Sequence, residues 1–237
     1  MRPSRRRFDK RSGSSGWPGL GARVVIFRSL FGSGSGGESV AELPVVRNIT
    51  IGRTVRLDTL AWRRLEGLNF DLGRDTLDIT AQGRIRLDDG SFVHRFYTND
   101  DVMLQAVSAM ADGSDADDFT IFHPWSSTYP SDELDTGAFA RRLFKASWQE
   151  EGLPRFERFW YAGDESDQEP VGLWEDVYEE RTGPPLRRIY QRCMLYSRAV
   201  APDGTELMLA IAMKPEGGDL THEIMIGIPL LPAEFNA

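Results

Sequence analysis

The sequence has few of the residue types that build covalent or metal-bound structure. It contains one cysteine, Cys193, among 237 residues. A single cysteine excludes an intrachain disulfide and a cysteine-based zinc site, and it fits a reducing compartment. The three histidines, His94, His123 and His222, are far apart and form no short metal-ligand pair. We therefore expect no metal centre and no other cofactor.

The sequence also lacks a long apolar run. No stretch approaches the roughly 20 apolar residues that span a bilayer, so we expect no transmembrane segment. Phe27, Leu30 and Phe31 nevertheless share the spacing of one helix face. These three residues are a candidate docking segment, either for peripheral contact with a membrane or for a protein surface.

Positive charge is scarce outside the N-terminal part of the chain. The net charge is −8, but residues 1–28 hold eight Arg or Lys against one Asp, a net of +7, which leaves −15 for the remainder. Affinity for nucleic acid comes largely from Lys and Arg that neutralise phosphates. The acidic main part of the chain therefore argues against a nucleic-acid partner.

Residues 1–37 have the composition of a tail and linker. They are rich in Arg, Ser and Gly and end in the run GSGSGG at residues 32–37. This run matches the glycine pattern of a dinucleotide-binding loop, but Pro44 follows too soon for the helix that such a loop must open. We predict a disordered basic tail over residues 1–37 and a single domain over residues 38–237.

Two Asp-Gly pairs, Asp89-Gly90 and Asp203-Gly204, lie between segments that alternate like β-strands. Asp-Gly favours the tight turn of a hairpin. Helical spacing of apolar residues predicts one helix over residues 57–68, and charge placement predicts a second over residues 131–148. The predicted fold class is α+β: a mostly antiparallel sheet built from two Asp-Gly hairpins, with two main helices packed on it. The two hairpins are either a diverged repeat or independent selections of the same turn.

No catalytic pattern stands out in the sequence. No serine lies in a G-x-S-x-G turn, and Cys193 lies within a predicted strand, where a buried thiol is the usual case. The histidines and aromatic residues offer one candidate ligand pocket, formed by His94, His123, Trp125 and Tyr129. The alternative is that residues 123–130 form a loop over the core. The sequence therefore leaves the enzyme question open and leans towards no enzymatic activity.

Several segments resemble the YjfK-like family of bacterial proteins of unknown function. They are FRSLFG at residues 27–32, LDTLAWRRL from Leu57, RIRLDDGSFVHRFYTNDD around the first hairpin, TYPSD at residues 128–132, and MLYSRAV before the second turn. The resemblance covers residues 27–237 and rests on structural motifs, so it carries over no catalytic residue.

The resemblance implies a cytoplasmic accessory protein at or near the inner membrane, associated with a relative of the phage-shock membrane-remodelling protein. The leading hypothesis is a non-enzymatic interaction or assembly factor in envelope stress, which docks its partner through an exposed sheet edge or through Phe27 to Phe31. The alternative is a small-molecule-binding protein or enzyme with a pocket near His94, His123 and Trp125.

Overall fold

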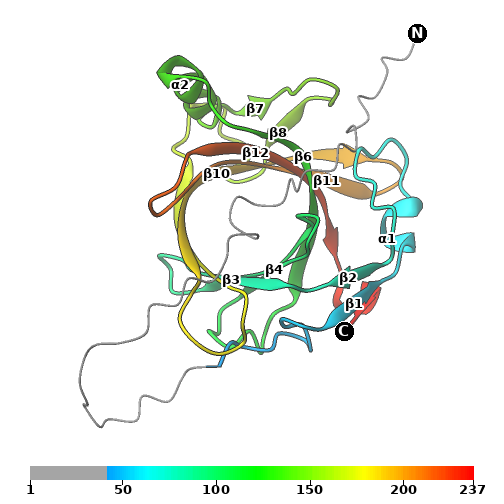
Figure 1. Ribbon diagram of the computed structural model, residues 1–237. Coiled ribbons are helices and arrows are strands. Elements are labelled where there is room, and N and C mark those ends of the chain that lie inside the picture. Colours follow the sequence, from blue (N-terminus) through cyan, green and yellow to red (C-terminus); the bar gives the residue numbers. More distant parts are fainter. Residues whose placement is uncertain (1–41) are drawn as a thin grey trace, which may run out of the picture. The chain divides into compact units, whose positions relative to one another are not determined.

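The computed structural model describes residues 42–237, and its main feature is a closed antiparallel barrel of eight strands (Figure 1). Around the barrel the strands are β3 (Ala81–Arg86), β4 (Phe92–Tyr97), β5 (Met103–Ser108), β6 (Asp118–Thr128), β12 (Thr221–Leu230), β11 (Gly204–Pro215), β10 (Arg187–Val200) and β9 (Val171–Tyr178). Pairing of β3 with β9 and of β6 with β12 closes the ring.

The barrel consists of two meanders of four strands each. Strands β3 to β6 form the first and β9 to β12 the second, and the second runs around the ring in the opposite sense. The hairpin at Gly90 joins the first and second strands of its meander, whereas the hairpin at Gly204 joins the second and third strands of the other. The two hairpins therefore occupy non-equivalent positions, which argues against an internal repeat.

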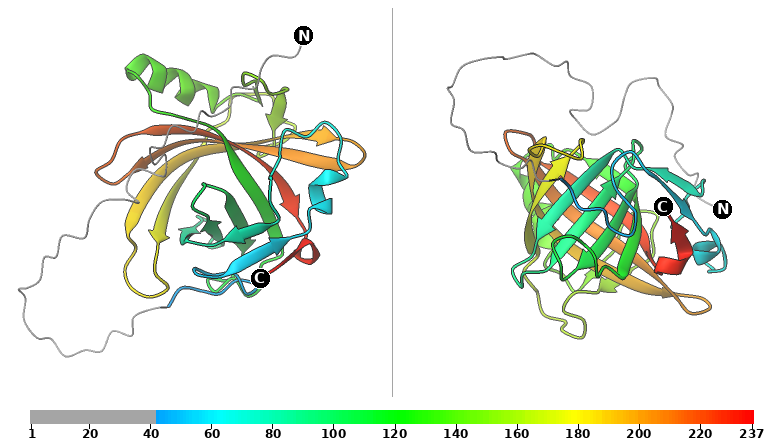
Figure 2. Two further views of the ribbon diagram at one scale, coloured as in Figure 1. Left: turned by 45° about the vertical axis from the view of Figure 1, so that its right-hand side comes forward. Right: turned by 90° about the horizontal axis from the view of Figure 1, so that it is seen from below.

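The remaining elements lie outside the barrel wall (Figure 2). A small sheet contains β1 (Thr54–Leu57), β2 (Thr76–Asp78) and β13 (Phe235–Asn236), near α1 (Leu60–Arg63) and the short 3-10 turn η1 (Pro232–Glu234). Two short strands, β7 (Ser147–Trp148) and β8 (Phe156–Arg158), continue the main sheet beyond β10, and α2 (Glu133–Arg142) precedes them.

The main hydrophobic core lies between the outer wall of the barrel and these covering elements. Strand residues alternate between two faces. On the outer face, Phe96, Ile121, Tyr196 and Ile226 pack with buried residues of the small sheet, α1 and β7–β8, among them Val55, Leu77, Trp62, Trp148 and Phe156. The opposite face of every barrel strand points into the barrel.

The predicted fold class is wrong, because the protein is a barrel-dominated β structure and not a sheet with two main helices. The segments beside the two Asp-Gly pairs do form strands, β3 and β4 around the first pair and β10 and β11 around the second. Their closure into a ring was not predicted, because it depends on pairing between strands far apart in the chain.

The predicted helix over residues 57–68 is only four residues long, Leu60–Arg63. Leu57 instead ends β1, where it pairs with Phe235, and the Asp58 amide donates to the Glu234 carbonyl at 2.7 Å. The second predicted helix exists as α2, and the Asp132 side chain accepts from the Asp135 amide at its start. This helix buries none of its residues. Tertiary pairing therefore replaced a predicted helix with a strand end at Leu57. The other helix contacts the core through the partly buried Phe139.

The described residues contain no helix that is long and apolar enough to cross a membrane. The candidate docking segment, Phe27, Leu30 and Phe31, and the predicted tail and linker at residues 1–37 lie outside the described residues. Those predictions, and the domain boundary between residues 37 and 38, stay predictions.

Candidate functional site in the barrel interior

A buried ion pair crosses the interior of the barrel. Arg95 on β4 donates through Nη1 to Glu175 Oε2 on β9 at 3.0 Å and to Gln191 Oε1 on β10 at 2.8 Å. The Arg95 and Glu175 side chains are 3% and 0% exposed. Strands β3 and β9 lie between β4 and β10, so a flat sheet would place Arg95 and Gln191 roughly 14 Å apart. The contact forms because the sheet curves round and both side chains point inwards.

Three neutral side chains complete the polar network around this pair. The Tyr97 hydroxyl donates to Glu175 Oε1 at 2.6 Å, and Gln191 Nε2 donates to Glu175 Oε2 at 2.5 Å. On the other side, Arg95 Nε donates to Gln105 Oε1 at 3.0 Å. The network thus joins β4, β5, β9 and β10, and both oxygens of the buried carboxylate are hydrogen-bonded.

Gly83 on β3 leaves the space in which Glu175 lies. It pairs with Arg95 on one side and with Val177 on the other, so it faces the interior. A Cβ atom at this position would lie 1.8 Å from Glu175 Oε1 and 2.8 Å from its Cδ. Only glycine allows the carboxylate to pass over β3 and reach Arg95 and Tyr97.

Burial and the neighbouring charges of the network shift the pKa values of Arg95 and Tyr97. Burial alone would lower the pKa of Arg95, but Glu175, together with Tyr97 and Cys193, outweighs burial and raises the pKa above its ordinary value. Burial, and then Glu175, raise the pKa of Tyr97 well above its ordinary value. Burying ions costs several kcal/mol per ion unless each is paired and hydrogen-bonded, and here both conditions are met.

A second carboxyl group faces the interior from β12. Glu223 pairs in register with Ser127 on β6 and with Ile211 on β11, and its Oε1 accepts a long hydrogen bond of 3.5 Å from the Ser127 hydroxyl. Burial, followed by the nearby charge of Asp101, raises the pKa of Glu223 to about 7, while Ser127 and Arg95 act in the opposite direction. Glu223 therefore changes its charge near neutral pH.

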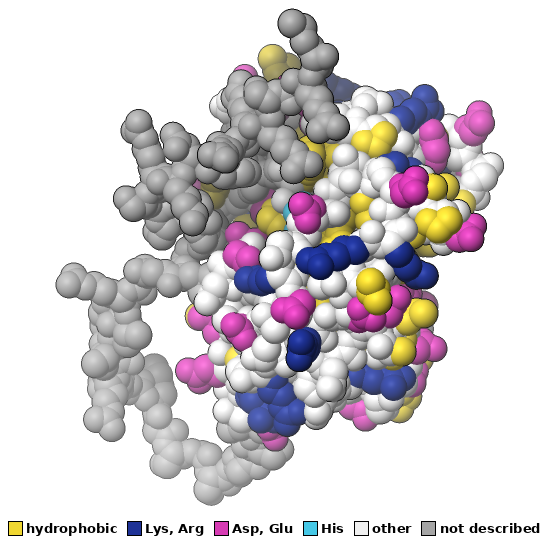
Figure 3. Space-filling view, turned by 90° about the vertical axis from the view of Figure 1, so that its right-hand side faces the viewer, with side chains coloured by type: hydrophobic (Ala, Val, Ile, Leu, Met, Phe, Trp, Pro, Cys, Tyr) yellow, Lys and Arg dark blue, Asp and Glu magenta, His cyan; other side chains and the backbone are white. Residues whose placement is uncertain are grey.

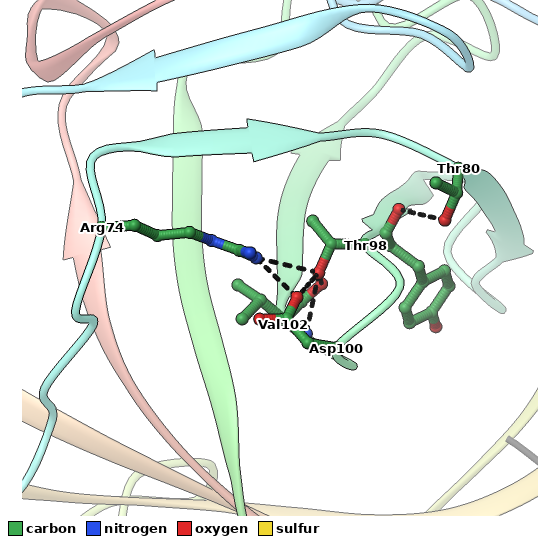
Figure 4. Close-up of polar contacts among 6 residues, drawn as sticks. Arg74, Thr80, Thr98, Asp100 and Val102 are labelled. Carbon is green, nitrogen blue, oxygen red and sulfur yellow. Dashed lines mark hydrogen bonds and ion pairs between the residues drawn. The ribbon is translucent and has the colours of Figure 1, made fainter. Parts of the chain in front are cut away.

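The β4–β5 turn fixes the position of Asp101. Arg74 Nη2 and the Thr98 hydroxyl both donate to Asp100 Oδ1, at 2.5 Å and 2.6 Å, and the Val102 amide donates to Thr98 Oγ1 at 3.2 Å (Figure 4). Within this turn Asp101 has a φ of 63°. The Arg74–Asp100 ion pair thus fixes the turn that holds Asp101 at the end of the barrel near Glu223.

Glu223→Gln should make the protein more stable at pH 8 but not near pH 4.5. The pKa of Glu223 is higher in the folded state than its ordinary value of 4.5, so its protonation stabilises the fold at low pH and this stabilisation is lost as the pH rises through about 7. Glutamine resembles the protonated acid at every pH. Urea unfolding at pH 8 should show a gain on the order of 2 kcal/mol. The same substitution at the exposed Glu151 is the control, and a pH-independent difference for Glu223→Gln would contradict the prediction.

The rest of the interior is mainly apolar. Buried residues that share the inward face include Ile85, Val93, Phe122, Leu173, Ile189, Leu209, Ile211, Met213 and Met225. Cys193 lies among them, and burial raises the pKa of its thiol to about 12, so it is not an activated nucleophile. The interior thus combines one polar region with an apolar lining.

The structure does not bring the four residues of the sequence-predicted pocket together. His94 on β4 and His123 on β6 both point outwards, where His123 packs edge-to-face on Phe70 at 5.3 Å. Trp125 packs against the main core, and Tyr129 is exposed. The third histidine, His222, stacks on Phe139 at 4.1 Å, and burial lowers the pKa of all three histidines. Within residues 42–237 no group of three or more His, Cys, Asp or Glu is arranged to hold a metal ion.

Comparison with known proteins places the chain in a family. The family model described as protein of unknown function DUF2491 matches residues 26–236. The chain belongs to the DUF2491 family. It is also 31% identical over 190 residues to the Escherichia coli (strain K12) protein described as uncharacterized protein YjfK, covering 78% of this chain and 83% of that protein. No solved structure matches significantly. The YjfK-like resemblance seen in the sequence is therefore confirmed.

Sequence reasoning missed the polar network of this DUF2491 member, although a signal was present. In the strand FVHRFY at residues 92–97, Arg95 shares a face with Val93 and Tyr97. Only Phe92 among these six residues is not buried. A charged residue between apolar neighbours of the same parity, on a strand that is also apolar on the other face, indicates a buried ion.

A hollow lies outside the barrel in this family member. It has a volume of about 410 Å³ and lies beside the small sheet, and it is lined by residues 56–59, Asp75 and residues 233–236. Its Arg56–Asp75 ion pair is long, 3.7 Å, and exposed. On this side of the molecule basic and acidic side chains are interspersed and apolar ones form only small groups (Figure 3). The hollow has no buried polar group that would select a ligand, so the barrel interior is the stronger candidate.

Proposed function

We propose that this protein binds a small amphipathic molecule inside its eight-stranded barrel. The observation that carries the proposal is the buried network of Arg95, Glu175, Tyr97, Gln105 and Gln191 within a mainly apolar interior. A barrel of eight strands has an interior that is either filled by side chains or able to hold one small ligand. A pocket that is apolar apart from a few fixed polar groups is the usual form of a ligand site.

Exposure of interior side chains supports a ligand site over a fully packed interior. Gln105 and Glu223 both face inwards, yet each keeps part of its surface accessible. Ser127, which donates to Glu223, is also partly exposed. These residues lie on β5, β12 and β6, which are adjacent in the ring. They define the side from which a ligand reaches the polar network.

Binding of the neutral apolar fluorophore N-phenyl-1-naphthylamine to the full chain tests this proposal. We expect saturable binding of one molecule per chain. Met225→Trp adds bulk to the interior and should weaken binding at least tenfold, whereas Met110→Trp makes the same change at an exposed position and should leave binding unchanged. Met225→Phe serves if the larger substitution prevents folding. Native mass spectrometry should show a small molecule retained by the purified chain or displaced by the fluorophore.

Two results would overturn the proposal. One is the absence of saturable binding at protein concentrations up to roughly 100 μM, which corresponds to less than about 5.5 kcal/mol of binding free energy. The other is equal binding by the wild type and by a folded Met225 variant, because the fluorophore would then lie outside the barrel. Circular dichroism and thermal unfolding establish that each variant is folded.

The interaction or assembly role in envelope stress stays a prediction, as do the phage-shock-type partner and a location at the inner membrane. Its sheet-edge route has little support, because ring closure pairs every barrel strand on both sides. The strands with one side wholly unpaired among residues 42–237 are short: two residues in β7, three in β2 and two in β13. A protein partner therefore needs a different surface.

A further inference from the structure

An exposed aromatic pair lies on the outer wall of the barrel, away from the covering elements. Trp174 on β9 and Tyr190 on β10 are directly opposite each other in register, with ring centroids 5.1 Å apart. Trp174 is 44% exposed and Tyr190 is 38% exposed. They alternate along their strands with Glu175 and Gln191, which point inwards, so they point outwards. In Figure 1 these yellow strands lie across the barrel from α1 and the small sheet.

Basic side chains surround this pair. Arg188 lies over the Trp174 ring at 4.8 Å from its centroid, and Lys214 on β11 is opposite Tyr190. Arg192 on β10 and Arg86 at the end of β3 have the outward parity of their strands. We call these six residues, Arg86, Trp174, Arg188, Tyr190, Arg192 and Lys214, the basic aromatic face.

The acidic partners of this face are few and weakly held. Asp176 lies 3.3 Å from Arg188, and Glu169 lies 3.8 Å from Arg192 and is 84% exposed. Exposed ion pairs of this kind contribute about 0–1 kcal/mol each, so they exchange readily for pairs with a partner. Arg188 and Arg192 are therefore available to a carboxylate from another chain.

The charge of this face is opposite to that of the domain. Residues 1–41 carry eight of the 28 Lys and Arg and two of the 36 Asp and Glu, which leaves 20 against 34, a net charge of −14 over residues 42–237. A cationic cluster on so acidic a domain is a local recognition feature. Anionic membranes and nucleic acids present extended negative charge, which the rest of the domain repels. A short acidic segment of a protein can contact the cationic cluster without approaching the acidic remainder of the domain.

We infer that the basic aromatic face docks an acidic segment of a partner protein, with an apolar or aromatic side chain of that segment on Trp174 and Tyr190. Trp, Tyr and Arg are the residue types that dominate binding energy at protein interfaces. The small extent of the face fits a weak, regulated contact, and the opposite charges accelerate encounter. This inference is independent of ligand binding in the barrel.

Selection of a random dodecapeptide phage library on the immobilised full chain tests the inference. We expect the enriched peptides to be rich in Asp and Glu around an aromatic residue or leucine. A fluorescein-labelled enriched peptide should bind with micromolar affinity by fluorescence polarisation and should bind more weakly as salt increases. Trp174→Ala and Arg188→Glu should each weaken binding at least tenfold. Tyr129→Ala removes another exposed aromatic side chain, outside this face, and should have no effect.

Three outcomes would overturn the inference. The first is no enrichment, or enrichment of peptides without acidic residues. The second is binding that is unchanged by both Trp174→Ala and Arg188→Glu. The third is binding of the chain to vesicles containing an anionic lipid, with loss on Arg188→Glu, in the absence of any peptide binding. Because the substituted side chains are exposed, the variants should retain the wild-type melting temperature.

Discussion

Replacing Arg95 by methionine should lower the free energy of unfolding by about 3–5 kcal/mol. Methionine keeps much of the side-chain volume but leaves the Glu175 carboxylate, which is 0% exposed, without its cation. Breaking a buried ion pair from one side is costly because the remaining charge stays buried. Urea unfolding of the full chain at pH 7 measures the loss.

A matched control separates this effect from the loss of a surface ion pair. Arg155→Met removes the cation of the Arg155–Glu157 pair, whose side chains are 64% and 63% exposed, and should cost less than about 1 kcal/mol. The double variant Arg95→Met with Glu175→Gln removes both charges and should recover much of the lost stability. If the free energy of unfolding of Arg95→Met were within about 1 kcal/mol of the wild-type value, the network would not be stabilising the barrel.

Gly83→Ala should destabilise the protein by about 2–3 kcal/mol, although alanine normally stabilises a strand relative to glycine. The new Cβ atom would lie 1.8 Å from Glu175 Oε1. Glu175 cannot turn aside without losing Arg95, Tyr97 or Gln191. Denaturant unfolding measures the loss, and the pairing of Gly83 with β4 and β9 makes a large backbone shift costly as well.

Gly172→Ala is the matched control for this substitution. Gly172 also lies in a barrel strand, but its added Cβ would meet the Tyr190 hydroxyl at 2.9 Å, on the partly exposed outer wall. Because the Tyr190 side chain can move into solvent, Gly172→Ala should change the free energy of unfolding by less than about 1 kcal/mol. A double-mutant cycle of Gly83→Ala with Glu175→Ala should show strong coupling, because Glu175→Ala removes the clash. Equal stability of the two glycine variants would contradict the argument from Glu175.

Strands β9 and β10 carry both proposed surfaces. Glu175 and Gln191 point into the barrel, and Trp174 and Tyr190, their immediate neighbours, point outwards. The two proposals can be separated experimentally, because Met225→Trp acts on the interior alone and Arg188→Glu acts on the outer wall alone. Failure of one binding test therefore does not contradict the other proposal.

Local sequence patterns located both hairpin turns and the strands that flank them. Gly90, for example, has the positive φ of 89° that the Asp-Gly turn predicts. The motifs were sufficient to indicate the family. These features depend on residues that are close together in the sequence, so short-range sequence patterns predict them.

The candidate pocket illustrates what such patterns do not contain. His94 lies on β4, and His123 and Trp125 lie on β6. The alternation of side chains along each strand places both histidines on the outer face of the barrel. Arg95, the residue next to His94, points inwards and contacts Glu175 and Gln191, which are 80 and 96 residues away in the chain. Neither partner could be assigned before the order of strands was known.

The sequence by itself indicated the two turns with their flanking strands, excluded an intrachain disulfide and indicated the family. Only the tertiary structure decided that the sheet closes into a ring and that Arg95 meets Glu175 inside it. The physical reason is that alternation fixes which side chains share a face of one strand, whereas closure is set by pairing between distant strands. The Asp-Gly hairpin at Gly90 is thus part of the closed barrel wall, and Arg95 on its second strand belongs to the candidate site in the interior.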